Sequence, residues 1–209
     1  MAYDFIFWDN DGVLVDTEGL YYRASQEALA RVGCALTPLQ FADISLASGR
    51  SVFELATGDP ALMEQLRDWR NSRYGDLLRG QDLVLPGIRT VLEQLATRVP
   101  MAIVTSSRRD HFDLIHARSG LLRHFEFVLC REDYVEAKPD PEPYLLALQR
   151  SGCDPANCLV IEDSARGLAA AKAAGLTCWM VPSAQTRAQD FSVADRILGE
   201  IGELPALLG

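Results

Sequence analysis

The chain has 209 residues, which suffices for one large domain or for a main domain with a smaller insertion. Hydrophobic residues make up 48% and charged residues 23%, which is typical of a compact globular protein and argues against a disordered or fibrous one. The net charge is −9 and no dense basic run occurs, so we expect no nucleic-acid partner, because phosphate backbones are bound by clustered cations.

The predicted compartment follows from the cysteines and from the lack of long apolar segments. No segment approaches the roughly 20 apolar residues that span a bilayer, and no basic segment precedes an apolar run at the start of the sequence. The 5 cysteines include no CxxC pair, so we expect buried free thiols in a reducing compartment. The sequence therefore predicts a cytoplasmic protein without a membrane segment, and it carries no signal for an oligomeric state.

Short apolar runs followed by polar residues predict strands along most of the chain. They cover residues 3–11, 101–107, 125–133, 158–164 and 177–181. Helical patterns lie between them at residues 87–98, 109–120, 141–152 and 164–175. Apolar strands that alternate with helices predict an α/β fold, a doubly wound, Rossmann-like parallel sheet covered on both faces.

Residues 16–83 break this alternation. Their patterns predict consecutive helices over residues 18–33, 38–48, 51–58 and 60–80. We therefore expect an all-helical cap domain of residues 16–83 inserted after the first strand, with hinges near residues 15–17 and 81–86. The α/β core then consists of residues 1–15 and 84–209.

Polar residues follow several of the predicted strands. In an open α/β sheet, ligands bind beyond the carboxyl ends of the strands, so these side chains are expected to converge. They are Asp9, Asp11, Thr105, Ser106, Lys138, Glu162 and Asp163. Crowded carboxylates cannot all ionise without a cation, and Mg²⁺ prefers oxygen ligands. We expect Asp9, Glu162 and Asp163 to bind Mg²⁺, helped by the backbone carbonyl of Asp11.

Each of these residues, taken alone, also has a purely structural interpretation. Asp163 or Ser164 could cap the helix that begins near residue 165. Lys138 lies beside prolines and could be solvated, and the hydroxyl of Thr105 could bind to the backbone. The two aspartates after the first strand could form a solvated turn.

Taken together, the motifs resemble the haloacid dehalogenase superfamily of phosphohydrolases. They are DNDGVLVDTE at residues 9–18, VTSS at 104–107, KPDPEPY at 138–144 and IEDSARGLAAAKAAG at 161–175. The resemblance covers essentially the whole chain, and it implies a Mg²⁺-dependent phosphatase for a small phosphorylated metabolite. It further implies that Asp9 is the nucleophile, that Asp11 is the general acid and base, that Thr105, Ser106 and Lys138 bind the phosphoryl group, and that Glu162 and Asp163 complete the metal site.

Within the superfamily, the sequence is most similar to sugar-phosphate phosphatases and β-phosphoglucomutases. The presence of Asp11 favours phosphate esters, because dehalogenases of the family lack a second aspartate. The mutases carry a histidine where this chain has Tyr21, which favours hydrolysis over a mutase reaction. Arg50, in SGRSVFEL, and Arg108, after TSS, are expected to contact the substrate.

Other cap residues, Tyr21, Arg23 and Arg73, are expected to help select the substrate, whereas His111 and His116 are interpreted as surface or packing residues. Two alternatives remain from other classes. A receiver-type phosphoacceptor domain also combines acids, a hydroxyl and a lysine, but its acceptor aspartate follows the third strand and it has no helical insertion. A catalytically silent binding protein has no support in the motifs.

Overall fold

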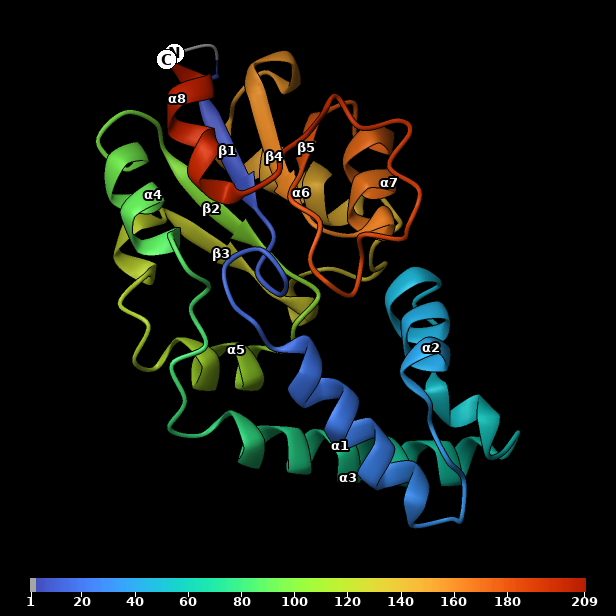
Figure 1. The fold of residues 1–209 in the computed structure, drawn as a ribbon. Helices are drawn as coiled ribbons and strands as arrows, with labels where there is room; N and C mark the ends of the chain where they lie inside the picture. Colours follow the sequence, from blue (N-terminus) through green and yellow to red (C-terminus); the bar gives the residue numbers. More distant parts are fainter. Residues whose placement is uncertain (1–2) are drawn as a thin grey trace.

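The computed structural model describes residues 3–209, and within this range a single six-stranded sheet forms the centre of the core (Figure 1). All strand pairs are parallel, and the strand order is β3-β2-β1-β4-β5-β6. The strands are β1 (Phe5–Trp8), β2 (Met101–Val104), β3 (Phe127–Leu129), β4 (Cys158–Glu162), β5 (Thr177–Met180) and β6 (Arg196–Ile197). The predicted doubly wound parallel fold is confirmed, and β6 is an additional edge strand that the sequence did not predict.

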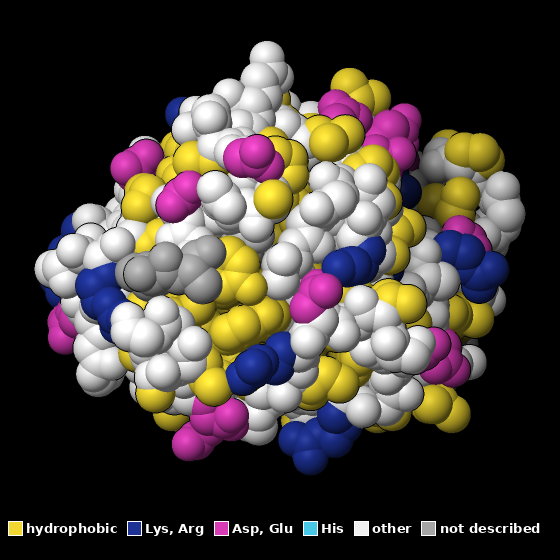
Figure 2. Space-filling model, turned by 90° about the horizontal axis from the view of Figure 1, so that it is seen from above, with side chains coloured by type: hydrophobic (Ala, Val, Ile, Leu, Met, Phe, Trp, Pro, Cys, Tyr) yellow, Lys and Arg dark blue, Asp and Glu magenta, His cyan; other side chains and the backbone are white. Residues whose placement is uncertain are grey.

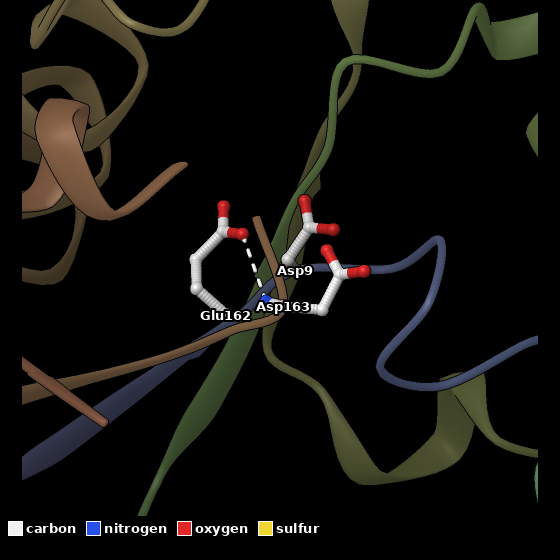
Figure 3. A group of neighbouring side chains, drawn as sticks. All are labelled: Asp9, Glu162 and Asp163. Carbon is white, nitrogen blue, oxygen red and sulfur yellow. Dashed lines mark hydrogen bonds between the residues drawn. The ribbon is translucent and has the colours of Figure 1, made fainter. Parts of the chain in front are cut away.

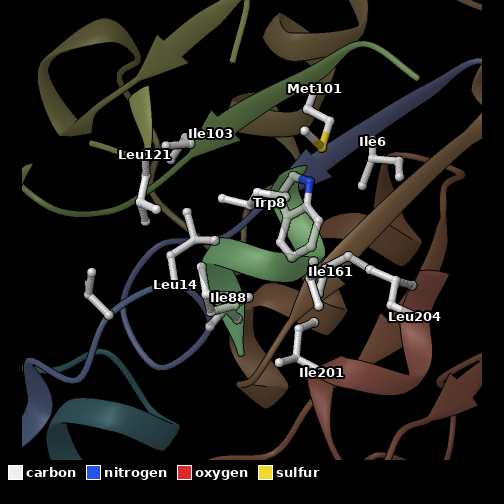
Figure 4. Packing of buried hydrophobic residues seen from close by; sticks show 14 of the residues in the cluster. Ile6, Trp8, Leu14, Ile88, Met101, Ile103, Leu121, Ile161, Ile201 and Leu204 are labelled. Atoms are coloured by element: carbon white, nitrogen blue, oxygen red, sulfur yellow. The ribbon is translucent and has the colours of Figure 1, made fainter. Parts of the chain in front are cut away.

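Helices cover both faces of the sheet. The face that carries Ile6 and Trp8 packs against α4 (Ile88–Leu95), α5 (Arg109–His116) and α8 (Leu204–Leu208). The face that carries Phe5 and Phe7 packs against α6 (Glu142–Ser151) and α7 (Ala165–Ala173). Figure 4 shows the indole of Trp8 enclosed by aliphatic side chains from neighbouring strands and helices. Because both faces are buried, the strands are continuously apolar.

Residues 18–78 form a helical unit below the sheet in Figure 1. It comprises α1 (Glu18–Ala30), α2 (Pro38–Phe41), the π-helical η1 (Ala42–Ala47), the 3₁₀-helical η2 (Val52–Leu55) and α3 (Pro60–Leu78). α1 and α3 lie side by side, and Leu29, Phe41 and Phe53 belong to a separate buried cluster. The helix predicted over residues 38–48 is divided between α2 and η1, and the one predicted over 51–58 is reduced to η2.

Two chain segments connect this helical unit to the core. Val15 pairs with Val84 in an antiparallel bridge. The N–H of Asp16 donates to the carbonyl of Leu83 at 2.8 Å, and the N–H of Leu85 donates to the carbonyl of Leu14 at 3.0 Å. We propose the domain boundaries at this paired crossing, between residues 15 and 16 and between residues 83 and 84.

The surface and the thiols complete the description of residues 3–209. Figure 2 shows the end of the molecule that carries α8, where basic and acidic side chains are interspersed. No helix in the described range is long and apolar enough to cross a membrane. The cysteines there are free thiols, and Cys130, Cys158 and Cys178 are buried as expected. Cys34 and Cys153 are only half-buried, so the prediction of buried thiols is wrong for these two.

Candidate active site

A cavity of about 660 Å³ lies between the core and the helical unit. Its floor is formed at the point where the chain order reverses in the sheet, between β1 and β4, which is where ligands bind in open α/β folds. Trp8 pairs with Ile161, so the two strands end at the same level. Asp9 follows β1 directly, and Glu162 and Asp163 come from the end of β4 (Figure 3).

Lys138 lies at the centre of this floor. Its Nζ donates to Asp9 Oδ1 at 2.7 Å, to Glu162 Oε1 at 2.7 Å and to the carbonyl of Val104 at 2.9 Å. Burial alone would lower the pKa of Lys138, but Asp9 and Glu162 raise it above its ordinary value. Lys138 is therefore a buried ammonium with all three donors in use, and its interpretation as a solvated lysine is wrong.

Ionisation of several carboxyl groups on the cavity floor is disfavoured, so their pKa values are raised. Burial, reinforced by Glu162, raises the pKa of Asp9 to about 8 in spite of Lys138. Burial also raises the pKa of Asp163 well above its ordinary range, with Glu162 and Glu18 adding to the effect. Glu18, the first residue of α1, has its own pKa raised by burial to about 7. One ammonium does not neutralise this group of acids.

The donor set fits a hard divalent cation. Asp9, Glu162 and Asp163 each offer a carboxylate oxygen, and these oxygens lie within 4.8 Å of one another. Oxygen donors of this kind are preferred by Mg²⁺, and a divalent cation would favour the ionised forms of Asp9 and Asp163, which burial and, to a lesser extent, the neighbouring acids disfavour. The side chain of Asp11 is not part of this group of three.

Glu162 is the most completely hydrogen-bonded of these acids. Its Oε1 accepts from Lys138 and, at 3.0 Å, from the hydroxyl of Tyr144. Its Oε2 accepts from the N–H of Asp163 at 3.1 Å. A Cβ at position 167 would overlap the Glu162 carboxylate, so Gly167 makes room for this carboxylate under the first turn of α7. Glu162 therefore holds Lys138 in place.

Asp163 is held near the turn that follows Asp9 and is not a helix cap. The hydroxyl of Ser164 caps α7 by accepting from the N–H of Gly167 at 3.2 Å. Gly12 has a φ of 81°, and a Cβ there would overlap the Asp163 carboxylate. A glycine is thus required at position 12 both by its backbone conformation and by the close approach of Asp163.

Asp11 is held by hydroxyl groups on the other side of the turn. Thr17 Oγ1 donates to Asp11 Oδ1, while Thr105 Oγ1 and Ser107 Oγ donate to Oδ2 at 3.2 and 2.7 Å. Sequence reasoning missed Ser107 and assigned Thr17 to the hinge alone. The run of hydroxyls in VTSS was the available signal for Ser107, since any of its three members could reach the cavity.

Several hydrogen-bond donors on the floor have no acceptor within the part of the chain that the structure describes. Ser106 Oγ is buried without a partner, and Ser106 lines the cavity. The backbone N–H groups of Asn10 and Asp11 likewise have no acceptor among residues 3–209. Because the hydroxyl of Thr105 is taken by Asp11, Ser106 is the member of the predicted hydroxyl pair that is available to a ligand.

The two arginines predicted to contact the substrate line the mouth of the cavity. Arg50 lies 3.8 Å from Glu54, and 62% of its side chain is exposed. Arg108 forms two hydrogen bonds of 3.1 Å with Asp110, and 50% of its side chain is exposed. Both guanidinium groups already have an acidic partner, so neither is an uncompensated charge.

The other cap residues divide into two groups. Tyr21 lines the cavity. Arg73 and Arg23 instead form ion pairs with Glu27 at 2.6 and 3.0 Å, and neither lines the cavity. Their predicted role in selecting the substrate is therefore not supported by their position.

His111 and His116 are buried and hydrogen-bonded, so of the two interpretations as surface or packing residues the packing one holds and the surface one is wrong. His116 Nε2 lies 2.8 Å from Asn10 Oδ1, and its Nδ1 lies 2.9 Å from Ser119 Oγ. Burial lowers the pKa of His116 to about 4, which keeps the ring neutral. His111 lines the cavity and contacts the carbonyl of Asn71 at 3.0 Å.

The parallel core, the helical insertion and the acidic cavity with its buried lysine together define a doubly wound α/β protein with a helical cap over a candidate active site. The chain belongs to the haloacid dehalogenase-like hydrolase family, whose model matches residues 6–181. The predicted family resemblance and the expectation of an enzyme are thereby confirmed.

Individual relatives extend over most of the chain. Protein CbbY of Rhodobacter capsulatus is 32% identical over 207 residues, covering 91% of this chain and 90% of that protein. The phosphorylated carbohydrates phosphatase of Thermotoga maritima is 30% identical over 176 residues, covering 82% of this chain and 81% of that protein. The crystal structure of CbbY from Rhodobacter sphaeroides in complex with phosphate has a TM-score of 0.84 at 25% identity, covering 97% of this chain and 96% of that one.

Proposed function

We propose that this protein is a Mg²⁺-dependent phosphatase that hydrolyses a small phosphomonoester, in particular a sugar phosphate, through an aspartyl-phosphate on Asp9. The observation that carries the proposal is the hydrogen-bonded group of Asp9, Lys138 and Glu162 at the end of β1, with Asp11 held separately beside it. A relative of 30% identity that is named a phosphorylated carbohydrates phosphatase supports the substrate class.

In the first step, a carboxylate oxygen of Asp9 forms a bond to phosphorus while the bond between phosphorus and the leaving alcohol oxygen breaks. Asp11 gives its proton to that oxygen, so the product leaves as a neutral alcohol. Lys138 keeps Asp9 in position through the 2.7 Å hydrogen bond and adds positive charge beside the reacting atoms.

In the second step, Asp11 accepts a proton from water, and the water oxygen attacks phosphorus. The bond between phosphorus and Asp9 breaks, which releases inorganic phosphate and restores the carboxylate. The hydroxyl donors Thr17, Thr105 and Ser107 fix the orientation of Asp11 in both steps.

Mg²⁺ would be held by Asp9, Glu162 and Asp163 together with the backbone carbonyl of Asp11, and when bound it supplies positive charge for the phosphoryl oxygens. The chain itself offers the hydroxyl of Ser106 and the N–H groups of Asn10 and Asp11 as donors to the same oxygens. The phosphate contact predicted for Thr105 stays a prediction, since its hydroxyl donates to Asp11 here.

A β-phosphoglucomutase-like activity is the alternative on the same site. Tyr21 stands where the mutases carry a histidine, and its ring packs edge-on against Tyr74 at 5.1 Å between centroids. The guanidinium of Arg70 lies 4.4 Å from the centroid of the same ring. Because the ring of Tyr21 serves in packing and a phenol does not replace the imidazole of a histidine as a proton shuttle, hydrolysis is the better-supported reaction. A receiver-type domain is not supported, since Asp9 ends the first strand and a helical unit follows it.

The test is the variant Asp9→Asn, because an amide cannot attack phosphorus. We expect it to lose phosphate release from sugar phosphates and p-nitrophenyl phosphate on the order of 10⁴-fold or more. Mass spectrometry of rapidly quenched protein should find a phosphoryl adduct on wild-type Asp9 and none in the variant. Asp16→Asn, an exposed position in the same motif, is the matched control. Near wild-type turnover in Asp9→Asn would refute the mechanism, and an isomerised sugar without free phosphate would favour the mutase.

A further inference from the structure

Arg70, in α3, is a buried cation on the cap wall of the cavity. Its exposed fraction is 9%, and its Nε donates to Asn71 Oδ1 at 2.9 Å. Among residues 3–209, no group accepts from its two terminal nitrogens, although Arg70 lines the cavity. A buried guanidinium is costly unless an acceptor compensates the charge. The terminal nitrogens of Arg70 are therefore free to donate to water or to a ligand in the cavity.

Aromatic rings hold the guanidinium of Arg70 in place. It lies 4.4 Å from the centroid of the Tyr21 ring and 5.5 Å from that of Phe53. Tyr21 is in turn fixed by its edge contact with Tyr74. Tyr21, which stands where the mutases carry a histidine, thus supports the guanidinium of Arg70 in this protein. A planar cation fixed between rings is suited to bind a carboxylate or a phosphate with two parallel hydrogen bonds.

The charges around Arg70 make an anion favourable there. Burial lowers the pKa of Arg70, and the cations Arg67 and Arg108 lower it further, opposed by Tyr21 and Tyr74. Arg67 and Arg108 have acidic partners, Glu64 and Asp110, whereas Arg70 has none among the described residues. Arg70 is therefore the uncompensated cation of this wall.

The face of α3 that carries Arg70 is directed towards the catalytic floor. Tyr74 lies one helical turn further along the same face, and Asp11 is close enough to contribute to the raised pKa of Tyr74. Both Arg70 and Asp11 line the one cavity. A small molecule whose phosphoryl group lies at Asp9 can thus extend along this face to Arg70.

We propose that Arg70 binds a second anionic group of the substrate, so that the substrate is a small phosphate ester with another carboxylate or phosphate at its far end. The inference rests on the proposed function for the place of the reacting phosphoryl group. The guanidinium of Arg70 on the cap would then bind the far end of the substrate, while the residues of the floor bind the phosphoryl group.

The experiment compares matched phosphate esters that differ in one anionic group. 3-Phosphoglycerate against glycerol 3-phosphate tests a second carboxylate, and glucose 1,6-bisphosphate against glucose 6-phosphate tests a second phosphate. For each pair, the ratio of kcat/KM is measured with Mg²⁺ in wild type, Arg70→Met and Arg70→Lys. Arg73→Met is the control, because Arg73 lies on the same helix but pairs with Glu27 and does not line the cavity. Calorimetry of the same compounds with Asp9→Asn, with and without Arg70→Met, measures binding without turnover.

We expect wild type to prefer the doubly anionic member of at least one pair. Arg70→Met should reduce that preference about 10- to 100-fold, the range expected for charge-assisted hydrogen bonds. Arg70→Lys should retain part of the preference, and Arg73→Met all of it. Equal preference in wild type and Arg70→Met, or no preference in wild type, would overturn the assignment. If no compound releases phosphate, the proposed function fails, while the calorimetric comparison still decides the role of Arg70.

Discussion

Removal of the buried ammonium of Lys138 should destabilise the core strongly. In Lys138→Met the stem of the side chain is kept and the charge is lost. The side chains of Lys138 and Glu162 are 3% and 1% exposed, so this change leaves buried carboxylates without their cation. Breaking a buried ion pair in this way costs about 3 to 5 kcal/mol. With an unfolding entropy of roughly 2.1 cal/mol/K per residue over 209 residues, the Tm should fall by about 7 to 11 °C.

Tryptophan fluorescence can follow this effect in the core. Trp8 and Trp179 lie in the sheet, whereas Trp69 lies in α3, so a Trp69→Phe background reports on the core. Thermal and urea unfolding of Lys138→Met in that background, measured without substrate, gives the change in the free energy of unfolding. Adding Glu162→Gln should restore at least about 1 kcal/mol, because it removes one of the uncompensated charges.

Lys172→Met is the matched control. Lys172 forms an ion pair of 2.8 Å with Asp195, but these side chains are 33% and 37% exposed. An exposed pair contributes about 0 to 1 kcal/mol. If Lys138→Met and Lys172→Met destabilise the protein equally, or if Glu162→Gln gives no recovery, the buried charge network is not what stabilises the floor of the site.

Two further predictions concern the metal and the pH. Mg²⁺ at about 100 times its Kd should stabilise wild type by about 2.7 kcal/mol, and Asp163→Asn should show little of this in calorimetric unfolding. At one fixed Mg²⁺ concentration the gain should be larger at pH 8 than at pH 6, because Asp9 and Asp163, whose pKa values are raised by burial, must lose protons to bind, which weakens Mg²⁺ binding at the lower pH. An equal gain in both proteins would exclude Asp163 as a ligand. The pKa of His116 is lowered to about 4, so wild type should lose about 3 kcal/mol as the pH falls from 6.5 to 4. Urea titrations of His116→Gln should be flatter with pH than those of wild type. Burial also lowers the pKa of His124, but this side chain is less buried than that of His116, so His124→Gln should flatten the curve less. Parallel curves for all three proteins would refute this.

The fold could be predicted because burial on both faces requires a continuous run of apolar residues in each central strand, and such runs are visible in the sequence. FIFW in β1 is fully apolar because Phe5 and Phe7 pack on one face and Ile6 and Trp8 on the other. β6 lacks an apolar run, since its two residues, Arg196 and Ile197, are both exposed. Its place in the sheet comes from backbone pairing with β5, which no side-chain pattern records.

The members of the site could be predicted from strand ends, but their partners could not. Neighbouring hydroxyls take different directions, so Ser107 donates to Asp11 while Ser106 remains without a partner among the described residues. Lys138 was expected, although nothing in the sequence indicates that three acceptors would use all of its donors. Arg70 carried no signal at all, because its burial depends on how α3 packs against Tyr21 and over the core.

Asn10, the residue between the two aspartates, shows how the core orients the site. It is completely buried, and its Oδ1 can only accept, so the neutral His116 must carry its proton on Nε2. The Nδ1 of His116 then accepts from Ser119, and the Nδ2 of Asn10 donates to Asp11 Oδ2 at 3.3 Å. The carbonyl of Asn10 also accepts from the N–H of Leu14 at 2.8 Å, within the turn that leads into the helical unit. The position of Asp11 is therefore set by the hydroxyls around it and, through Asn10, by His116 of α5, which is 106 residues from Asn10 in the sequence.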